Sequence, residues 1–251
     1  RQWVCPPSKG ERPRWSFNVD HFVTSTDTLY LLSKEGKASG GALVSAFTSA
    51  VAAAGEADGV RAGGRMPTPM LLVLDEAANV VRWRDLPKQY SHFGSRGIVV
   101  MTILQSWAQG VGCWGEAGMK ALWSAANIKV LGSGLDDEDF LQARSRIVGD
   151  HRELVTSVSR GRRADSGTES TSLTTEATLT ASDIAAMPRG RALVFTSGHR
   201  STLVRTTPWM ERADADLIRE SIAAHAPTQS GTTTAGPRLR AVPSDEEDNA
   251  A

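Results

Sequence analysis

The sequence predicts an α/β fold in which a mainly parallel β-sheet is flanked by helices. Three observations support this: short runs of continuous apolar residues, helical stretches between them, and a length of 251 residues, enough to bury a full core. Continuous apolar runs are typical of strands covered on both faces, as in parallel sheets. Strands that alternate with helices at this spacing indicate an α/β sheet.

The N-terminal part predicts one short strand and one helix. Residues 1–20 are rich in Pro, Trp and charge, and we expect an irregular lead-in. A short β-type run, Thr28–Leu32, comes next. It is followed by a loop over 33–41 and an alanine-rich helix over about 42–54. A Gly- and Arg-rich loop over 55–65 is expected to end this helix.

The runs that define the sheet lie further along the chain. The two strongest are Met70–Leu74 (MLLVL) and Gly97–Leu104 (GIVVMTIL), and weaker ones follow at Ile128–Leu131 and Ala192–Thr196. Helices are expected between them, over 86–93, 115–126 and 136–148.

The pattern changes after about residue 148. Residues 157–178 are polar and rich in Ser, Thr and Arg, so they fit either a mobile loop or an exposed hairpin arm. A short helix is expected to begin near Thr180 and to end at Pro188. After residue 226 no apolar period remains, which predicts a disordered tail.

Composition excludes several classes of protein. Lys and Arg total 28, as do Asp and Glu, so no overall field favours nucleic acid or membrane, and any DNA contact must come from local patches. Cys5 and Cys113 are too few for a disulfide framework, which favours a reducing, cytosolic setting. No apolar run is long enough to span a bilayer, and no signal peptide is visible.

Two adjacent acids follow the first strong apolar run. In MLLVLDE, Asp75 and Glu76 are expected just beyond the carboxyl end of a buried strand, where α/β sheets bind their ligands. This is the Walker B arrangement. Asp75 would hold Mg²⁺ directly or through a water, and Glu76 would orient or deprotonate the attacking water. The alternative is a strand that merely ends in two solvated acids.

A polar amide follows the second apolar run. Gln105 is expected at the end of the neighbouring strand, where its amide can contact the γ-phosphate or the lytic water and so sense hydrolysis. Alternatively, the Gln105-Ser106 step serves only to start a helix at Trp107, with Ser106 as its cap. Both interpretations can hold together.

Arginines supply two further candidate sites. Arg96 lies just before the second run and is a candidate arginine finger for a neighbouring subunit, or else a solvated loop residue. The stretch after residue 139 is locally basic, and within it Arg160, Arg162 and Arg163 are candidates for contact with a DNA backbone. A solvated helix face with a flexible arm is the alternative. The residues of this basic stretch are Arg144, Arg146, Arg152, Arg160, Arg162 and Arg163.

The order of these motifs resembles the type IV coupling proteins of the TraG/TraD kind, which are conjugation ATPases related to FtsK- and HerA-type DNA pumps. The resemblance covers roughly residues 15–210. The segment with Walker B and the Gln strand is similar to the TraM recognition region of TraD and TraG. The motifs are LLVLDEAAN, then SRGIVVMTILQS, then IKVLGSG, and finally LTASDIAAMPRGRALVF.

The resemblance implies a RecA-like P-loop ATPase domain over residues 21–212, present here as its C-terminal portion, with the TraM recognition region over about 68–200. Residues 213–251 would form a short helix and a disordered tail. It further implies ATP and Mg²⁺ as cofactors and a homohexamer at the cytoplasmic face of the bacterial plasma membrane. The whole protein would deliver single-stranded DNA, with its relaxase and relaxosome accessory proteins, to a type IV secretion channel.

The sequence departs from the family pattern in two places. No G-x-x-x-x-G-K-[ST] phosphate-binding loop (Walker A) occurs, and the glycine-rich segment 33–41, with Lys37, lacks the required Ser or Thr after its Gly-Lys. We therefore expect the phosphate loop to lie upstream of this chain and the isolated chain to be inactive. Gly94 stands where many family members carry Arg, which puts the role of Arg96 in doubt.

Two other functions stay open at this point. One is a docking module that recruits relaxosome or accessory proteins without hydrolysing ATP, which the missing phosphate loop and the polar arm and tail favour. The other is an FtsK/HerA-type DNA translocase unrelated to conjugation.

Overall fold

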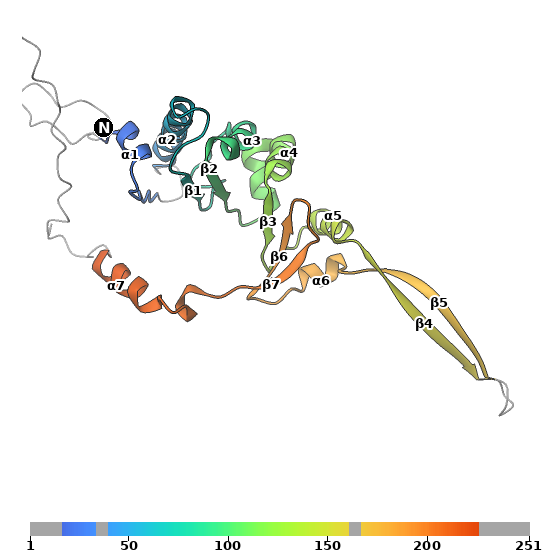
Figure 1. Ribbon diagram of the computed structural model, residues 1–251. Helices are drawn as coiled ribbons and strands as arrows, with labels where there is room; N and C mark the ends of the chain where they lie inside the picture. The colour runs from blue at the N-terminus through green and yellow to red at the C-terminus, as the bar shows by residue number, and fades with distance from the viewer. Residues whose placement is uncertain (1–16, 34–39, 161–166, 226–251) are drawn as a thin grey trace, which may run out of the picture. The chain divides into compact units, whose positions relative to one another are not determined.

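The computed structural model describes residues 17–33, 40–160 and 167–225 and confirms the α/β fold (Figure 1). The chain divides into two compact units, residues 1–206 and 207–251. All the described strands lie in the first unit. Among the described helices, none is both long enough and apolar enough to cross a membrane.

The centre of the first unit is a pair of parallel strands, β1 (Met70–Leu74) and β2 (Ile98–Thr102), in register from Met70–Ile98 to Leu74–Thr102. Helix α3 (Leu86–Arg96) connects them. Pro near its first turn suits the helix start, and Gly97, in the left-handed conformation at φ 84°, ends it directly before β2.

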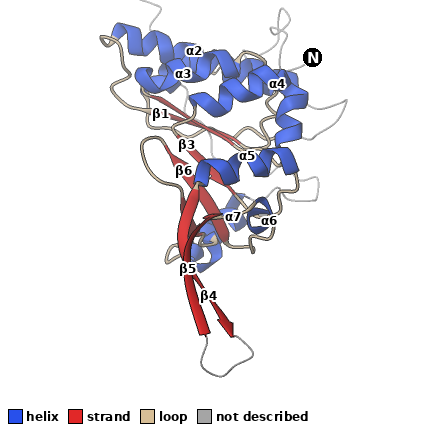
Figure 2. Cartoon of the chain, turned by 90° about the vertical axis from the view of Figure 1, so that its right-hand side faces the viewer, coloured by secondary structure: helices blue, strands red, loops and turns tan. Residues whose placement is uncertain are grey.

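Helices α2 (Gly41–Arg61), α3 and α4 (Trp107–Ala125) pack on one side of this strand pair, as Figure 2 shows. Leu74 and Ile98 are buried beneath them. The side chains that alternate with these are exposed, so the described residues leave the other face of the pair largely open. They are Leu71, Val73, Val99 and Met101.

Helix α2 is longer than the sequence predicted, because it runs on through Gly55 and Gly59 to Arg61. Both glycines are buried where the helix approaches its neighbours. A Cβ on Gly55 would lie 2.7 Å from the Met70 Cε atom, so these glycines serve close packing rather than a loop.

The strand predicted at Thr28–Leu32 is wrong. After the short helix α1 (Val19–Thr24) the chain is extended but pairs with no described strand. Tyr30 and Leu32 are 84% and 94% exposed. A run of β-favouring residues forms a strand only where another strand completes its hydrogen-bond ladder.

The weaker apolar runs form a second, antiparallel sheet rather than a continuation of the parallel pair. Its order is β3 (Ile128–Leu131), β6 (Arg191–Thr196), β7 (Thr202–Arg205). Helices α5 (Glu138–Val148) and α6 (Ala181–Ala185) cover it. The buried core of this part consists of Leu131, Leu141, Ile184, Leu193 and Phe195.

Between α5 and α6 the chain forms a long hairpin of β4 (Asp150–Arg160) and β5 (Gly167–Ala177), each 11 residues long. Of the two predicted alternatives, the hairpin arm is therefore confirmed. Gly149 makes the step from helix to strand at φ 89° and ψ −177°, a conformation that residues with a Cβ rarely adopt.

The second unit contains a 3₁₀ turn, η1 (Trp209–Glu211), and helix α7 (Ala215–His225). In the turn that joins η1 to α7, the Arg212 guanidinium donates to both carboxylate oxygens of Asp214, each at 2.9 Å. Residues 1–16 and the predicted disordered tail, 226–251, lie outside the described residues.

Candidate functional site

Asp75 and Glu76 lie at the carboxyl end of β1, where the chain turns sharply. The backbone N–H of Glu76 donates to Asp75 Oδ1 at 3.0 Å, and Glu76 itself has φ 46°. The N–H groups of Asn79 and Val80 donate back to the Glu76 carbonyl. A left-handed conformation is uncommon for a residue with a long side chain, and such strain is concentrated at functional sites.

Gln105 is brought directly to Glu76, 29 residues away in the sequence. Its Nε2 atom donates to Glu76 Oε1 at 3.0 Å. Backbone bonds hold the two strand ends together: Ile103 N–H donates to the Leu74 carbonyl at 3.0 Å, and Ala77 N–H donates to the Ile103 carbonyl at 3.1 Å. The carboxylate and the amide therefore meet at one edge of the parallel pair.

Gln109 is a further member of this group, which the sequence reasoning missed. Its Nε2 donates to Gln105 Oε1 at 3.1 Å, so the Gln105 amide is held from both ends. The sequence carried no clear signal for it, because Gln105 precedes the N-cap of α4 and only Gln109 lies in the helix. Ser106 also caps α4, since its Oγ accepts from the Gln109 N–H at 3.2 Å. The predicted helix cap at Ser106 is therefore confirmed, while Gln105 contacts the neighbouring acid.

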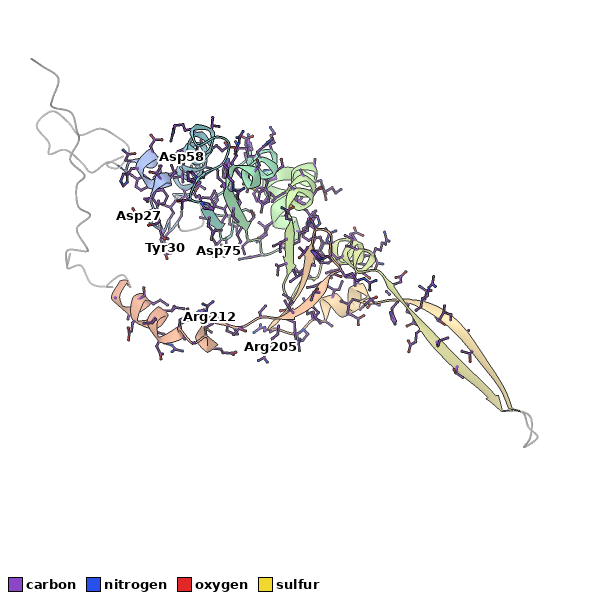
Figure 3. The ribbon with its side chains drawn as sticks, viewed as in Figure 1. Asp27, Tyr30, Asp58, Asp75, Arg205 and Arg212 are labelled. Atoms are coloured by element: carbon purple, nitrogen blue, oxygen red, sulfur yellow. The ribbon has the colours of Figure 1, made fainter. Side chains whose placement is uncertain are left out.

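Asp75 is exposed and lines a groove of about 740 Å³ along the free edge of β1. The opposite wall is the extended segment 26–32, including Asp27 and Tyr30, which Figure 3 labels together with Asp75. The walls are mainly apolar. The groove therefore presents an acidic group at the end of an apolar surface, a common arrangement in ligand sites.

The donor atoms at this edge fit a magnesium ion held in part by another molecule. Mg²⁺ prefers oxygen ligands and usually binds one or two carboxylates together with phosphate oxygens and water. Asp75 offers an exposed carboxylate next to the Glu76–Gln105 pair. The described residues contain no phosphate-binding loop, and Lys37 lies outside them.

Arg96 is not part of this group. Arg96 is the last residue of α3, directly before the amino end of β2. It therefore lies at the opposite end of the parallel strands from Asp75, which follows the carboxyl end of β1. Its guanidinium donates to the Gly64 carbonyl at 3.1 Å. If Arg96 contacts such a site at all, it must be the site of a neighbouring subunit.

The predicted basic stretch is divided by the fold. Arg160 is the last residue of β4, while Arg162 and Arg163 lie outside the described residues. Arg144, by contrast, is buried, with only 8% exposed, so it is neither a DNA contact nor part of a solvated face.

Arg144 is enclosed by aromatic rings instead. Its guanidinium carbon lies 4.1 Å from the ring centre of Trp123, 4.2 Å from that of Phe140 and 5.6 Å from that of Trp107. Burial lowers the pKa of Arg144. Its buried Nε has no hydrogen-bond partner in the described part of the chain. Cation–π contact with the rings offsets part of the cost of this burial. Trp107 and Trp123 therefore pack around an arginine that the sequence reasoning did not place there.

The fold and the site define a class before any comparison: an α/β protein with paired acids and an amide at the carboxyl edge of parallel strands. Residues 69–189, just under half of the chain, match the family described as the TraM recognition site of TraD and TraG. This stretch is therefore similar to the C-terminal region of type IV coupling proteins that carries this recognition site.

Solved structures of one coupling protein are similar to this chain. The unbound monoclinic form of the bacterial conjugative coupling protein TrwBdeltaN70 has 19% identity and a TM-score of 0.49, and the match covers 67% of this chain and 38% of that one. TrwB in complex with the GTP analogue GDPNP has 18% identity and a TM-score of 0.48, and the match covers 67% of this chain and 38% of that one. TrwB with ADP and Mg²⁺ has 19% identity and a TM-score of 0.46, with 67% of this chain and 37% of that one covered. This chain thus spans well under half of TrwB. No curated protein matches the chain.

Proposed function

We propose that this chain supplies the Walker B acids and the hydrolysis-sensing amide of a conjugative coupling ATPase with a RecA-like motor domain. The whole protein would use ATP to move single-stranded DNA and its relaxase into a type IV secretion channel. One observation carries the catalytic part of the proposal, the 3.0 Å bond from Gln105 Nε2 to Glu76 Oε1 at the carboxyl edge. The family of residues 69–189 supports the role in conjugation.

Each residue then has a defined task. Asp75, exposed at the strand end, holds Mg²⁺ directly or through a water. Glu76 would orient the attacking water or take a proton from it. Bound ATP with Mg²⁺ supplies the transferable phosphoryl group. Gln105 holds the Glu76 carboxylate in place, and Gln109 holds Gln105.

Gln105 also offers a route for sensing hydrolysis. Its amide has one donor bond to Glu76 and sits directly before Ser106, which caps α4. A phosphate oxygen near the amide would compete with Glu76 for that donor. The exchange would pull on the first turn of α4, so the presence or loss of the γ-phosphate would move this helix.

Several features of the whole assembly belong to the same proposal. The motor would be a homohexamer attached to the cytoplasmic face of the bacterial plasma membrane, with the phosphate loop supplied by sequence outside this chain. Arg96 would act, if at all, on the nucleotide of a neighbouring subunit. Arg160, Arg162 and Arg163, at and beyond the end of β4, would contact DNA from the hairpin.

The decisive experiment is Glu76→Gln in the motor protein that includes the phosphate loop. We expect ATP hydrolysis to fall by roughly 100-fold or more while nucleotide binding is kept, because the amide cannot accept a proton from water. Glu116→Gln is the matched control: Glu116 is exposed on α4 and, among the described residues, forms an ion pair only with Lys120. Turnover that survives in Glu76→Gln would remove the catalytic assignment.

A docking function is the second candidate, and the family description of residues 69–189 as a TraM recognition site favours it. In this case the chain would bind a small DNA-bound accessory protein of the relaxosome without hydrolysing ATP. The test is direct binding of such a protein to this chain and to a variant in which a short turn replaces the β4–β5 hairpin. Binding by the chain and none by the variant would place the docking surface on the hairpin.

A further inference from the structure

We propose that the β6–β7 hairpin carries a separate binding surface for the phosphodiester backbone of nucleic acid, centred on Arg191 and Arg205. This surface would be where the proposed motor protein binds its DNA. Only the identity of the ligand rests on the proposed function. The two arginines are direct antiparallel partners in the register, so their side chains emerge on the same face of the sheet.

The pair is held firmly in this arrangement. Thr206 N–H donates to the Gly190 carbonyl at 2.8 Å, and Arg191 N–H donates to the Pro188 carbonyl at 3.2 Å, so backbone bonds fix the chain beside both arginines. Like charges directly opposite each other destabilise an antiparallel pair. A sheet that places two arginines there gains stability when an anion binds between them.

Nothing described in the chain supplies that anion. Both arginines are exposed, and neither forms an ion pair or side-chain hydrogen bond within the described residues. The sequence contains no acid between Asp183 and Glu211. The same interval carries four arginines, all of them exposed: Arg189, Arg191, Arg200 and Arg205 (Figure 3 labels the last). In a chain of zero net charge this is a basic segment without acids.

The surroundings favour phosphate over the carboxylates of a protein partner. One exposed hydroxyl residue, Thr206, directly follows Arg205. Arginine and hydroxyl groups together are the usual contacts of a phosphate backbone. A protein interface would need an apolar centre, but on the face of the arginine pair β7 exposes only Leu203. Without an exposed aromatic residue on the two strands, base stacking is absent, so binding should be independent of sequence and steeply salt-dependent.

The test measures binding of a fluorescent oligothymidine to this chain across a salt series, without ATP. For Arg191→Gln/Arg205→Gln we expect an affinity lower by about 10-fold or more, and a salt slope smaller by about 1.4, because each phosphate contact on a single strand contributes about 0.7. The control Arg61→Gln/Arg84→Gln removes the same charge from the exposed Arg61 and Arg84 elsewhere and should change affinity by less than about 3-fold. Equal losses in both variants would overturn the proposal.

A second variant separates binding from structure. Arg205→Glu creates an ion pair with Arg191 across the strands, so the melting temperature should rise while the affinity for the oligonucleotide falls. Unchanged affinity would overturn the proposal.

Competitors identify the source of the anion. Displacement by duplex DNA as well as by single strands supports a general phosphate surface, and displacement by single strands alone supports one for the transferred strand. Polyglutamate that competes as well as DNA of equal charge would overturn the proposal in favour of an acidic protein partner. The Glu76→Gln variant should bind the oligonucleotide normally, so this surface and the catalytic assignment can fail separately.

Discussion

Glu76 takes part in the site through both its backbone and its carboxylate. Its backbone takes the left-handed conformation that turns the chain out of β1, and its carboxylate accepts from Gln105. A positive φ at a residue with a Cβ costs on the order of 1 kcal/mol. The bonds from Asn79 and Val80 N–H to the Glu76 carbonyl, together with the Gln105 contact, hold the residue there. At this scale a backbone conformation decides where a carboxylate lies.

Arg144 gives a prediction at the same scale. Its side chain is buried among Trp107, Trp123 and Phe140, without an acidic partner in the described residues and with Nε unpaired. Replacing such a group by an apolar one of similar volume removes the cost of burying a charge. We expect Arg144→Leu to change the free energy of unfolding by less than about 1 kcal/mol in either direction, or to raise it.

Urea denaturation measures this difference. Trp123→Ala is the companion variant, and it should lower the free energy of unfolding by about 3 kcal/mol or more, because it opens a cavity against Phe140 and Phe195. A loss of that size for Arg144→Leu as well would show that the cation holds α4 and α5 together.

At the scale of elements, helix α6 shows how local sequence starts a structure. Thr180 Oγ1 accepts from the Asp183 N–H at 3.1 Å, and Asp183 accepts in return from the Thr180 N–H at 2.8 Å, which completes a capping box. The short helix then buries Ile184 in the second core. Because α6 follows the β4–β5 hairpin directly, its cap fixes where the hairpin ends.

This capping box predicts a pH dependence. Hydrogen bonds from the Thr180 side chain and backbone lower the pKa of Asp183 below its ordinary value. A carboxyl whose pKa is lower in the folded state stabilises the protein above its unfolded pKa, and this contribution is lost as the pH falls through the folded pKa. Melting temperatures of the wild type and Asp183→Asn should therefore differ at neutral pH and converge as the pH falls through the lowered pKa of Asp183 in the folded protein.

A constant difference between the two melting temperatures across that range would contradict this origin of the stability. Ser182→Ala, on the neighbouring exposed residue, should leave the profile of the wild type unchanged.

At the scale of the whole molecule, the described part of the first unit covers the parallel pair β1–β2 with helices on one side only. Parallel strands are normally covered on both faces, yet Leu71, Val73, Val99 and Met101 are more than half exposed. The extended segment Thr28–Leu32 borders the same strands along the groove. An apolar face of this kind marks a surface that other protein elements cover.

The ATPase prediction belongs to this scale. Under the proposed function Asp75, Glu76 and Gln105 would act on a phosphoryl group, but the sequence holds no phosphate-binding loop that would position one. We expect the 251-residue chain to show no ATP hydrolysis with or without single-stranded DNA. A longer protein that includes the phosphate loop should hydrolyse ATP and be stimulated by the DNA. Hydrolysis by the chain alone would mean that a loop around Lys37 binds phosphate after all.

Much of the site could be predicted because its signals are local. A continuous apolar run determines a buried strand, and the residues that end it determine which groups reach the sheet edge. For this reason Met70–Leu74 and the positions of Asp75, Glu76 and Gln105 follow from the sequence alone. The caps Ser106 and Thr180 are local in the same way.

Tertiary structure decided whatever depends on residues far apart in the chain. It placed the Gln105 amide on Glu76, buried Arg144 among aromatic rings, and set β6 antiparallel to β3 after the long hairpin. It also left Thr28–Leu32 unpaired. The physical reason is that the period and polarity of a segment describe which faces it can bury, whereas strand direction, partner and burial of a charge depend on what the rest of the fold brings against it.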